Sequence, residues 1–433
     1  MSSLLYLTRR RTLGWLVAAT ASLRLRANAF PAHSMTKLRP EDEAFLDELE
    51  RRACLYFTEQ AHPVNGQVLD RAAAATPSGK LDPRRNASIA ATGFGLTALC
   101  IAHKRGYAPA QAVRDQVLRT LRFHATEMSH EHGFFYHFND IDSGQPMSWS
   151  EVSSIDTALL LCGVLTARAY FSGDPEIVQH ATLIYERVDW PWMLNGGDQF
   201  SMGWNPGKGF LKATWNHYCE LMMIPLLALG SPTHPVAPRV WDAWSRPKIT
   251  YDGLSYVSGD DPLFVHQYSH AWFDFRNHRD AYANYFQNSI TATRAHKAFC
   301  LDLGKPYSDR YWGITASDSE SGYQAWGGPP RIGRIDGSVV PCAAAGSLAF
   351  VPGDCLFVLR ALKAEFGAKA WGRYGFCDAF HPEALWYDPD VLGIDLGIGV
   401  LMAENLRSEF VWKAFAQNTE VSHAMQRAGF HLP

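Results

Sequence analysis

A glutamate at the start of an apolar segment is the residue in this chain best suited to acid–base chemistry. Glu220 follows the aromatic and polar run Trp215–Cys219 and precedes the apolar run Leu221–Leu229. Ionising a carboxyl group beside so much hydrocarbon is costly, and the low dielectric raises its pKa. Such a group can serve as a general acid near neutral pH. The alternative from the residues alone is that Glu220 only charges the first turn of the following helix.

Other carboxylates stand beside serine, glycine and aromatic residues. Ser148 and Glu151 have the spacing of a capping box, so we expect Glu151 to cap a helix unless Trp149 lines a pocket. Asp156, just inside the same helix, is expected to be a buried hydrogen-bonding residue. Asp395 has glycine neighbours and fits the N-cap of the next helix, or else a functional role as a base or as an acceptor of sugar hydroxyls. Further candidates are Asp318, Glu320 and Asp336.

Aromatic side chains and histidines accompany these carboxylates. His266 and His270 are four residues apart and could chelate a metal on one helical face, but no third ligand stands at a fitting spacing. Stacking and hydroxyl recognition, shared with Tyr268 and Trp272, explain the same residues without a metal. Other loop motifs contain Trp204, Trp215 and Trp326.

Paired carboxylates and flat aromatic surfaces are the equipment for binding sugars and cleaving glycosidic bonds. The chain has no G-x-S-x-G elbow, no P-loop and no G-x-G-x-x-G following a strand. These absences argue against serine hydrolase, nucleotide-dependent and dinucleotide-dependent chemistry.

Helical periodicity dominates the elements that must position these residues. Sustained strand alternation is scarce, so we expect an all-α fold, and the alternation of helix pairs suggests an α/α toroid. Long aromatic loops between the helices are expected to be functional. The expected helices are 40–60, 88–104, 109–127, 151–171, 175–188, 217–229, 268–276, 279–300, 353–366, 397–407, 409–416 and 419–428.

The first 29 residues have the composition of an export signal. Arginines 9–11 precede an apolar run, and Ala27-Asn28-Ala29 fits a cleavage site, as in twin-arginine signals. We therefore expect residues 30–433 to form a single catalytic domain in a soluble periplasmic or secreted protein. The signal holds five arginines and no acidic residue, which leaves 35 basic against 43 acidic residues and a net charge of about −8.

Composition also limits the partners. No basic stripe is present, which argues against nucleic-acid binding, and no other apolar run is long enough for stable membrane insertion. The eight cysteines show neither a C-x-x-C pair nor a zinc spacing. We expect buried free thiols, although one bridge among Cys342, Cys355 and Cys377 is an alternative.

A series of motifs runs in order from about residue 40 to the C-terminus: Phe134–Phe138, Ser150–Leu160, Met202–Trp204, Leu229–Pro235, His266–His270, Trp312–Asp318, Tyr374–Phe376 and Gly393–Asp395. Together they resemble the glucoamylase-like family, which includes the β-1,2-glucanases of glycoside hydrolase family 144. The resemblance covers nearly the whole chain after the signal. It departs at Ser319-Glu320-Ser321, where the family is expected to have a shorter turn, and this bears on chain-length preference and substrate identity.

The resemblance implies a single (α/α)6 toroid whose long aromatic loops form the active cleft at one end. It also implies anomer-inverting hydrolysis of β-1,2-glucan without a metal or organic cofactor. It assigns Glu220 as the general acid and places Glu151 and Asp395 at other acidic positions of the cleft, either of which could activate water. We further expect a monomer that binds β-glucan oligo- or polysaccharide. The expected substrate-binding residues are Tyr136, Trp149, Asp156, Trp204, Trp215, Tyr218, His266, Tyr268, Trp272, Asp318, Tyr323 and Trp326.

Four alternatives share these residues. Exo-acting hydrolysis and transglycosylation need the same carboxylates as endo-hydrolysis. A polysaccharide lyase needs a Tyr or His base and cations beside a uronate, and the motifs here contain few arginines. A non-catalytic glucan-binding protein would bind sugar without forming any product.

Overall fold

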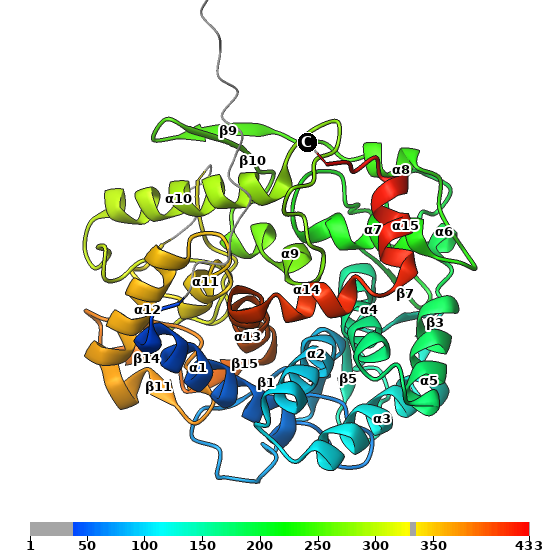
Figure 1. Ribbon diagram of the computed structural model, residues 1–433, viewed down its shortest axis with the longest axis horizontal. Coiled ribbons are helices and arrows are strands. Elements are labelled where there is room, and N and C mark those ends of the chain that lie inside the picture. Colours follow the sequence, from blue (N-terminus) through cyan, green and yellow to red (C-terminus); the bar gives the residue numbers. More distant parts are fainter. Residues whose placement is uncertain (1–37, 330–334, 433) are drawn as a thin grey trace, which may run out of the picture. The chain divides into compact units, whose positions relative to one another are not determined.

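The computed structural model describes residues 38–329 and 335–432, so the expected export signal lies outside the described residues. The described residues form one compact unit. It is rich in helix, as the periodicity predicts (Figure 1). The helices are α1 (Pro40–Glu59), α2 (Ile89–Arg105), α3 (Ala110–Thr126), α4 (Ser154–Tyr170), α5 (Pro175–Glu186), α6 (Trp190–Met193), η1 (Glu220–Met222), α7 (Met223–Gly230), α8 (Arg239–Asp242), η2 (Leu263–His266), α9 (Tyr268–Trp272), α10 (Tyr285–Leu303), α11 (Pro341–Ala345), α12 (Pro352–Phe366), η3 (Gly367–Lys369), α13 (Gly393–Ser408), α14 (Phe410–Phe415) and α15 (Thr419–Arg427).

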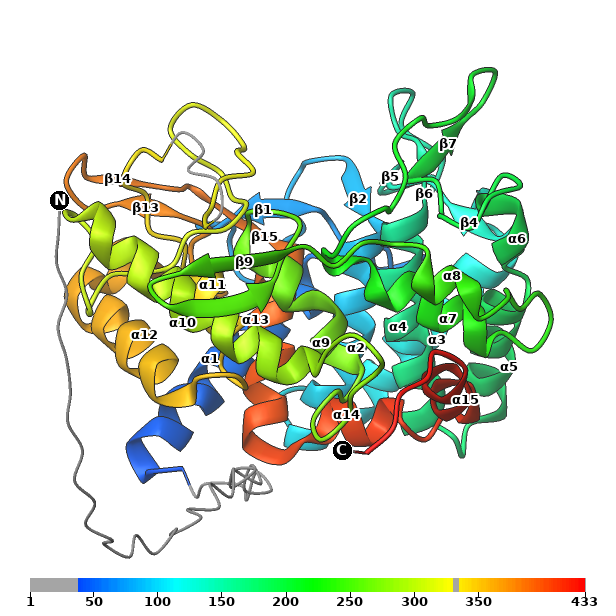
Figure 2. The same ribbon diagram turned by 90° about the horizontal axis from the view of Figure 1, so that it is seen from above.

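Short strands, each of two to four residues, pair in small antiparallel sheets. Most of them lie along one side of the helices, the upper side in Figure 2. Among the described residues they are β1 (Arg71–Ala73), β2 (Asn86–Ser88), β3 (His130–Glu131), β4 (Phe134–Phe135), β5 (Phe138–Asp140), β6 (Val152–Ser153), β7 (Gly203–Asn205), β8 (Gly209–Phe210), β9 (Lys248–Tyr251), β10 (Leu254–Val257), β11 (Trp371–Gly372), β12 (Gly375–Phe376), β13 (Phe380–His381), β14 (Trp386–Tyr387) and β15 (Asp390–Leu392).

The long periodic segments became helices with small errors at their ends. The largest errors are at the start of α10, which begins at Tyr285 and not at 279, at the end of α9, which is Trp272 and not 276, and at the start of α13, which is Gly393 and not 397. Residues 217–219 precede the helical turn, α4 begins at Ser154 and not at 151, and α10 continues to Leu303. Helices α6, α8 and α11 are not predicted by the sequence pattern, because helices of four or five residues are too short for a helical period to show.

Three helices begin directly after a strand, which fixes their first turn. Strand β2 leads into α2, β6 into α4 and β15 into α13. Ser153 is the N-cap of α4, and its Oγ accepts a hydrogen bond from the backbone N–H of Asp156. The capping box expected for Glu151 was therefore wrong, because Glu151 precedes strand β6. The N-cap expected of Asp395 was also wrong: Leu392 holds that position, and Asp395 is the third residue of α13.

Helices α2 and α4 approach each other at two glycines. A Cβ on Gly163 would lie 2.0 Å from the carbonyl oxygen of Gly93, and a Cβ on Gly93 would lie 2.3 Å from the carbonyl oxygen of Leu159. Both distances are far below van der Waals contact, so the two backbones meet where a side chain would otherwise separate them. Helix α2 also packs against α1 and α13, and α4 against α5 and α7.

Replacing Gly163 with alanine is expected to destabilise the fold by about 3 kcal/mol or more, because the added methyl group must push two helix backbones apart. Thermal unfolding of Gly163→Ala measures the loss. The control is Gly173→Ala, since a Cβ at Gly173 would meet no atom within 4 Å. Equal unfolding temperatures for the two variants would contradict this description of the α2–α4 contact.

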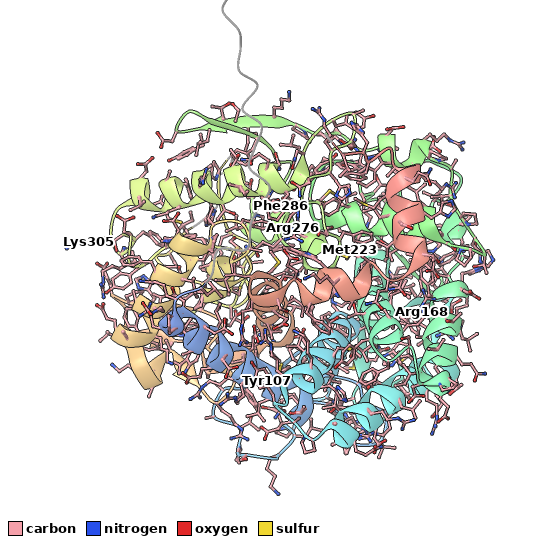
Figure 3. The ribbon with its side chains drawn as sticks, viewed as in Figure 1. Tyr107, Arg168, Met223, Arg276, Phe286 and Lys305 are labelled. Carbon is pink, nitrogen blue, oxygen red and sulfur yellow. The ribbon has the colours of Figure 1, made fainter. Side chains whose placement is uncertain are left out.

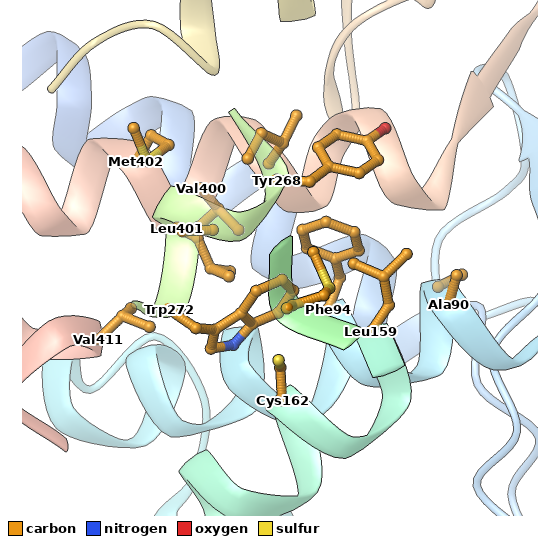
Figure 4. Packing of buried hydrophobic residues seen from close by; sticks show 14 of the residues in the cluster. Ala90, Phe94, Leu159, Cys162, Tyr268, Trp272, Val400, Leu401, Met402 and Val411 are labelled. Carbon is orange, nitrogen blue, oxygen red and sulfur yellow. The ribbon is translucent and has the colours of Figure 1, made fainter. Parts of the chain in front are cut away.

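Aromatic rings fill the space between α2, α9 and α13 (Figure 4). The Phe94 and Trp272 ring centroids lie 4.9 Å apart, and those of Phe94 and Tyr268 lie 5.5 Å apart. The indole N–H of Trp272 donates to Thr97 Oγ1 at 3.0 Å, and the side chain is fully buried. Trp272 therefore belongs to the core, and the prediction that it contacts sugar was wrong.

Polar networks tie the helices together away from the strands. Tyr107, labelled in Figure 3, donates to Asp47 Oδ1 at 2.8 Å, and the guanidinium of Arg407 on α13 contacts the buried Glu50 of α1. Arg168, also labelled there, joins α4 to the C-terminal segment through Asn418 and Glu420.

All eight cysteines are buried free thiols, as expected, and the alternative of a bridge among three of them is not realised. Among the described residues, no helix combines the length and the apolar character needed to cross a bilayer.

Candidate active site

Glu220 is the first residue of η1 and is only partly buried. Its backbone carbonyl accepts a hydrogen bond from Ser269 Oγ at 2.8 Å, and the backbone N–H of Met223 donates to the same hydroxyl. Burial raises the pKa of the Glu220 carboxyl to about 7, and the charges of Asp260 and Asp156 add to the rise. The carboxyl group is thus half protonated near neutral pH and still reaches solvent.

His137 joins two of the candidate carboxylates. Its Nδ1 lies 3.3 Å from Glu151 Oε1, and its Nε2 lies 3.4 Å from Asp156 Oδ1. Burial alone would lower the pKa of His137, but the two carboxylates raise it above its ordinary value. The hydrogen bond from His137 in turn lowers the pKa of Glu151. Glu151 is therefore a carboxylate at neutral pH and cannot be the general acid.

Asp395 lies in a second group of acids. Burial raises its pKa to about 6, although hydrogen bonds from Asp378 and Cys342 oppose the rise. Burial and the neighbouring Asp395 raise the pKa of Asp378 well above its ordinary value. Asp378 Oδ2 also accepts the backbone N–H of Asp318 at 2.7 Å.

Two arginines balance part of this acidic group. Arg71 lies 2.5 Å from Asp318 Oδ2 and 3.2 Å from Asp70 Oδ2, and Arg84 lies 2.8 Å from Asp390 Oδ1. Burial raises the pKa of Asp70 despite its contact with Arg71.

The two groups of acids lie within electrostatic range of one another. Glu220 is influenced by Asp156, and His137 by both Asp156 and Asp70. Asp70 acts on Asp395 in turn. Tyr268 is influenced by both Asp395 and Glu220. The start of α4, the start of α13 and the η1 turn therefore bring their carboxyl groups together at the end of the helices where the strands lie.

Three of the expected aromatic contacts are accessible. Trp149 is 56% exposed, and its ring packs against Phe138, whose own ring stacks on His137. Tyr323 is 50% exposed. Trp204 is partly buried in β7, which pairs with β6 directly before α4. Flat faces in these positions can stack on sugar rings.

Several other expected contacts are buried and serve the fold. Tyr218 is fully buried and lies 3.2 Å from His266 Nδ1, and the pKa of His266 falls to about 3 because of burial and the nearby His296. The prediction that Tyr218 contacts sugar directly was therefore wrong. Side chains that are almost wholly buried, and so offer at most an edge, are Tyr136, Trp215, His266, Tyr268, Asp318 and Trp326.

The pair His266 and His270 does not form a metal site. His270 Nε2 lies 3.0 Å from Ser289 Oγ, and burial lowers its pKa to about 3. Two other groups have ligand atoms within 4.8 Å of one another, His137 with Glu151 and Asp156, and Asp318 with Asp378 and Asp388. Arg71 already neutralises Asp318, and His137 bridges the first group, so both have partners without a metal. That the chain needs no metal stays a prediction.

Sequence reasoning missed His137, Asp378 and Asp260. His137 stands inside the aromatic run Phe134–Phe138, and Asp378 stands two residues after Tyr374–Phe376, but neither spacing indicates a carboxylate partner. Asp260 raises the pKa of Glu220, which stands 40 residues earlier, and only the folded chain brings the two together.

The helical fold and the acid-rich site agree with the resemblance to glucoamylase-like proteins. Residues 212–419 match the family model described as "Putative glucoamylase". This match confirms the family resemblance that the sequence motifs indicate.

Particular relatives are also similar. The "exo beta-1,2-glucooligosaccharide sophorohydrolase (non-reducing end)" of Parabacteroides distasonis is 26% identical over 442 residues, covering 91% of this chain and 59% of that protein. The chain thus spans about three fifths of that relative's length. A glucoamylase-type structure from Bacteroides uniformis is 27% identical with a TM-score of 0.84, covering 92% of this chain and 99% of the other. An endo-β-1,2-glucanase from Chitinophaga pinensis, in complex with sophorotriose and glucose, is 25% identical with a TM-score of 0.83, covering 90% and 98%.

Proposed function

We propose that this protein is an exported glycoside hydrolase that cleaves β-1,2-glucan with inversion of the anomeric centre. Its helices close into an (α/α)6 toroid, with residues 30–433 as the catalytic domain and residues 1–29 as a twin-arginine signal. The mature protein acts as a monomer in the periplasm or outside the cell, without a metal or organic cofactor.

The observation that carries this proposal is the partly buried Glu220 with a pKa of about 7. A general acid works best when its pKa lies near the operating pH. An inverting glycosidase needs one protonated and one ionised carboxyl group, held apart in different environments. Glu220 supplies the protonated carboxyl group, and the acids around Asp395 supply the ionised one.

In this mechanism Glu220 protonates the leaving glycosidic oxygen. Asp395, largely ionised at neutral pH with its pKa of about 6, accepts the proton of the attacking water, either directly or through a hydroxyl group of the substrate. Trp149 and Tyr323 stack on sugar rings. The names of the relatives from Parabacteroides distasonis and Chitinophaga pinensis support β-1,2-glucan as the substrate class.

Incubation with a panel of glucans tests the proposal. We expect oligosaccharides from linear β-1,2-glucan and little product from starch, with the product initially in the α-anomeric form by NMR. Product sizes over time separate endo- from exo-action, and new linkages would reveal transglycosylation. Glucose from starch with none from β-1,2-glucan would overturn the proposal, and an unsaturated, ultraviolet-absorbing product would indicate a lyase.

Replacing Asp260 with asparagine is expected to move the alkaline limb of the pH–rate profile to lower pH. The negative charge of Asp260 raises the pKa of Glu220, after burial itself, so its removal lets Glu220 lose its proton earlier. The shift should be a fraction of one pH unit, about 0.5. Asp252→Asn, in the exposed β9–β10 turn, is the control. A limb that stays in place or rises would show that Asp260 does not act on Glu220.

A further inference from the structure

Asp378 and Asp395 form a buried carboxyl pair. Asp378 follows β12, and Asp395 lies in the first turn of α13; the two side chains are within hydrogen-bonding reach of each other. They are 4% and 8% exposed. Asp378 Oδ1 and Asp395 Oδ2 receive no hydrogen bond from any backbone N–H or non-carboxyl side chain of the described residues. Two ionised carboxylates in this arrangement would repel each other strongly.

Among residues 38–329 and 335–432, no cation balances the pair. Arg71 is engaged by Asp70 and Asp318, and Arg84 by Asp390. In the described part of the chain, no ion pair reaches Asp378 or Asp395. A shared proton is therefore the cheapest way to bury both groups, as in carboxyl dyads generally.

The anchoring of the two groups differs. Asp378 is fixed by a backbone hydrogen bond, because its Oδ2 accepts the Asp318 N–H at 2.7 Å. Asp395 also receives a hydrogen bond from the Cys342 thiol at the start of α11. The titratable or charged groups that face the pair from the surrounding elements are Asp70, Tyr268, Asp318, Tyr323, Cys342, Cys377 and Asp388.

We propose that Asp378 is a positioning residue that keeps a proton at neutral pH and donates it as a hydrogen bond to Asp395, holding Asp395 as an oriented carboxylate. This inference rests on the proposed function, since it takes Asp395 as the base. Asp378 itself does not touch the substrate. Its hydrogen bond stabilises the ionised form of Asp395 and so keeps the base active at lower pH.

The test compares two substitutions of Asp378. In Asp378→Asn the amide N–H still donates to Asp395 and the amide oxygen still accepts from Asp318, so most of the activity should be kept. Asp378→Ala loses both bonds, and kcat/KM at pH 7 should fall about 100-fold. Its acidic limb should move up by about one pH unit, because Asp395 loses a donor. The infrared spectrum should show the band of a protonated buried carboxyl that disappears in Asp378→Asn.

Three results would overturn the inference. Asp378→Asn could be as inactive as Asp378→Ala, which would mean that Asp378 acts as an anion. The infrared band could be absent from the wild type. Calcium could raise the unfolding temperature of the wild type but not of Asp378→Asn, which would make Asp378 a cation ligand. The infrared and calcium measurements do not depend on catalysis, so they separate a failure of this inference from a failure of the proposed function, which Asp395→Asn tests on its own.

Discussion

Glu220→Gln is expected to reduce turnover on β-1,2-glucan at neutral pH by about 10²–10⁴-fold. Glutamine keeps the shape of the side chain but cannot donate a proton to the leaving oxygen. The alkaline limb of the pH–rate profile, which reports the Glu220 pKa of about 7, should disappear. A substrate whose leaving group needs no protonation should lose far less activity. Steady-state kinetics on both substrates check this result.

The stability of the same variant separates a catalytic role from a structural one. The folded-state pKa of Glu220 is raised from 4.5 to about 7. The folded protein therefore binds more protons than the unfolded chain in this window, and its stability falls as the pH rises from about 4.5 to 7. Glu220→Gln lacks this loss, so above pH 7 it should be as stable as the wild type or more stable, by up to about 3 kcal/mol.

Glu383→Gln, in the exposed β13–β14 turn, is the matched control and should behave like the wild type. Turnover of Glu220→Gln within a few-fold of the wild type, together with lower stability, would remove Glu220 from the mechanism and leave it as a structural residue of η1.

Asp395→Asn should lower turnover by a similar factor, about 10²–10⁴-fold, because the attacking water loses its base. Glu151→Gln should cost much less, since Glu151 contacts His137 and is held ionised well below the operating pH. Azide needs no base, so it should restore product formation in Asp395→Asn as the glycosyl azide of inverted configuration. Azide rescue of Glu151→Gln but not of Asp395→Asn would show that Glu151, and not Asp395, is the base.

The sequence predicts the long helices because their apolar positions repeat with the helical period. It does not predict α8 or α11, which hold too few residues to show one, nor the paired strands of two or three residues that precede α2, α4 and α13. Those strands are stabilised by partners far away in the chain, such as β1 for β15. A local pattern contains no information about such a partner.

The site was predictable where burial and charge are local. Glu220 stands beside an apolar run, and its raised pKa follows from that neighbourhood. The assignments of Trp272 and Tyr218 failed because an aromatic residue near polar neighbours can face either a loop or the core. The pairing of Asp378 with Asp395 depends on residues 17 positions apart that meet only after α13 packs against α11.

The strands that precede α4 and α13 also place an aspartate at the same position in each helix. Asp156 and Asp395 are each the third residue of a helix, and Ala91 holds the same place in α2. Since each of these helices begins directly after its strand, the third residue has the same offset from the strand end in all three. These three positions are therefore equivalent in the scaffold, and a substitution at one of them changes the side chain offered to the site while the helices keep their places.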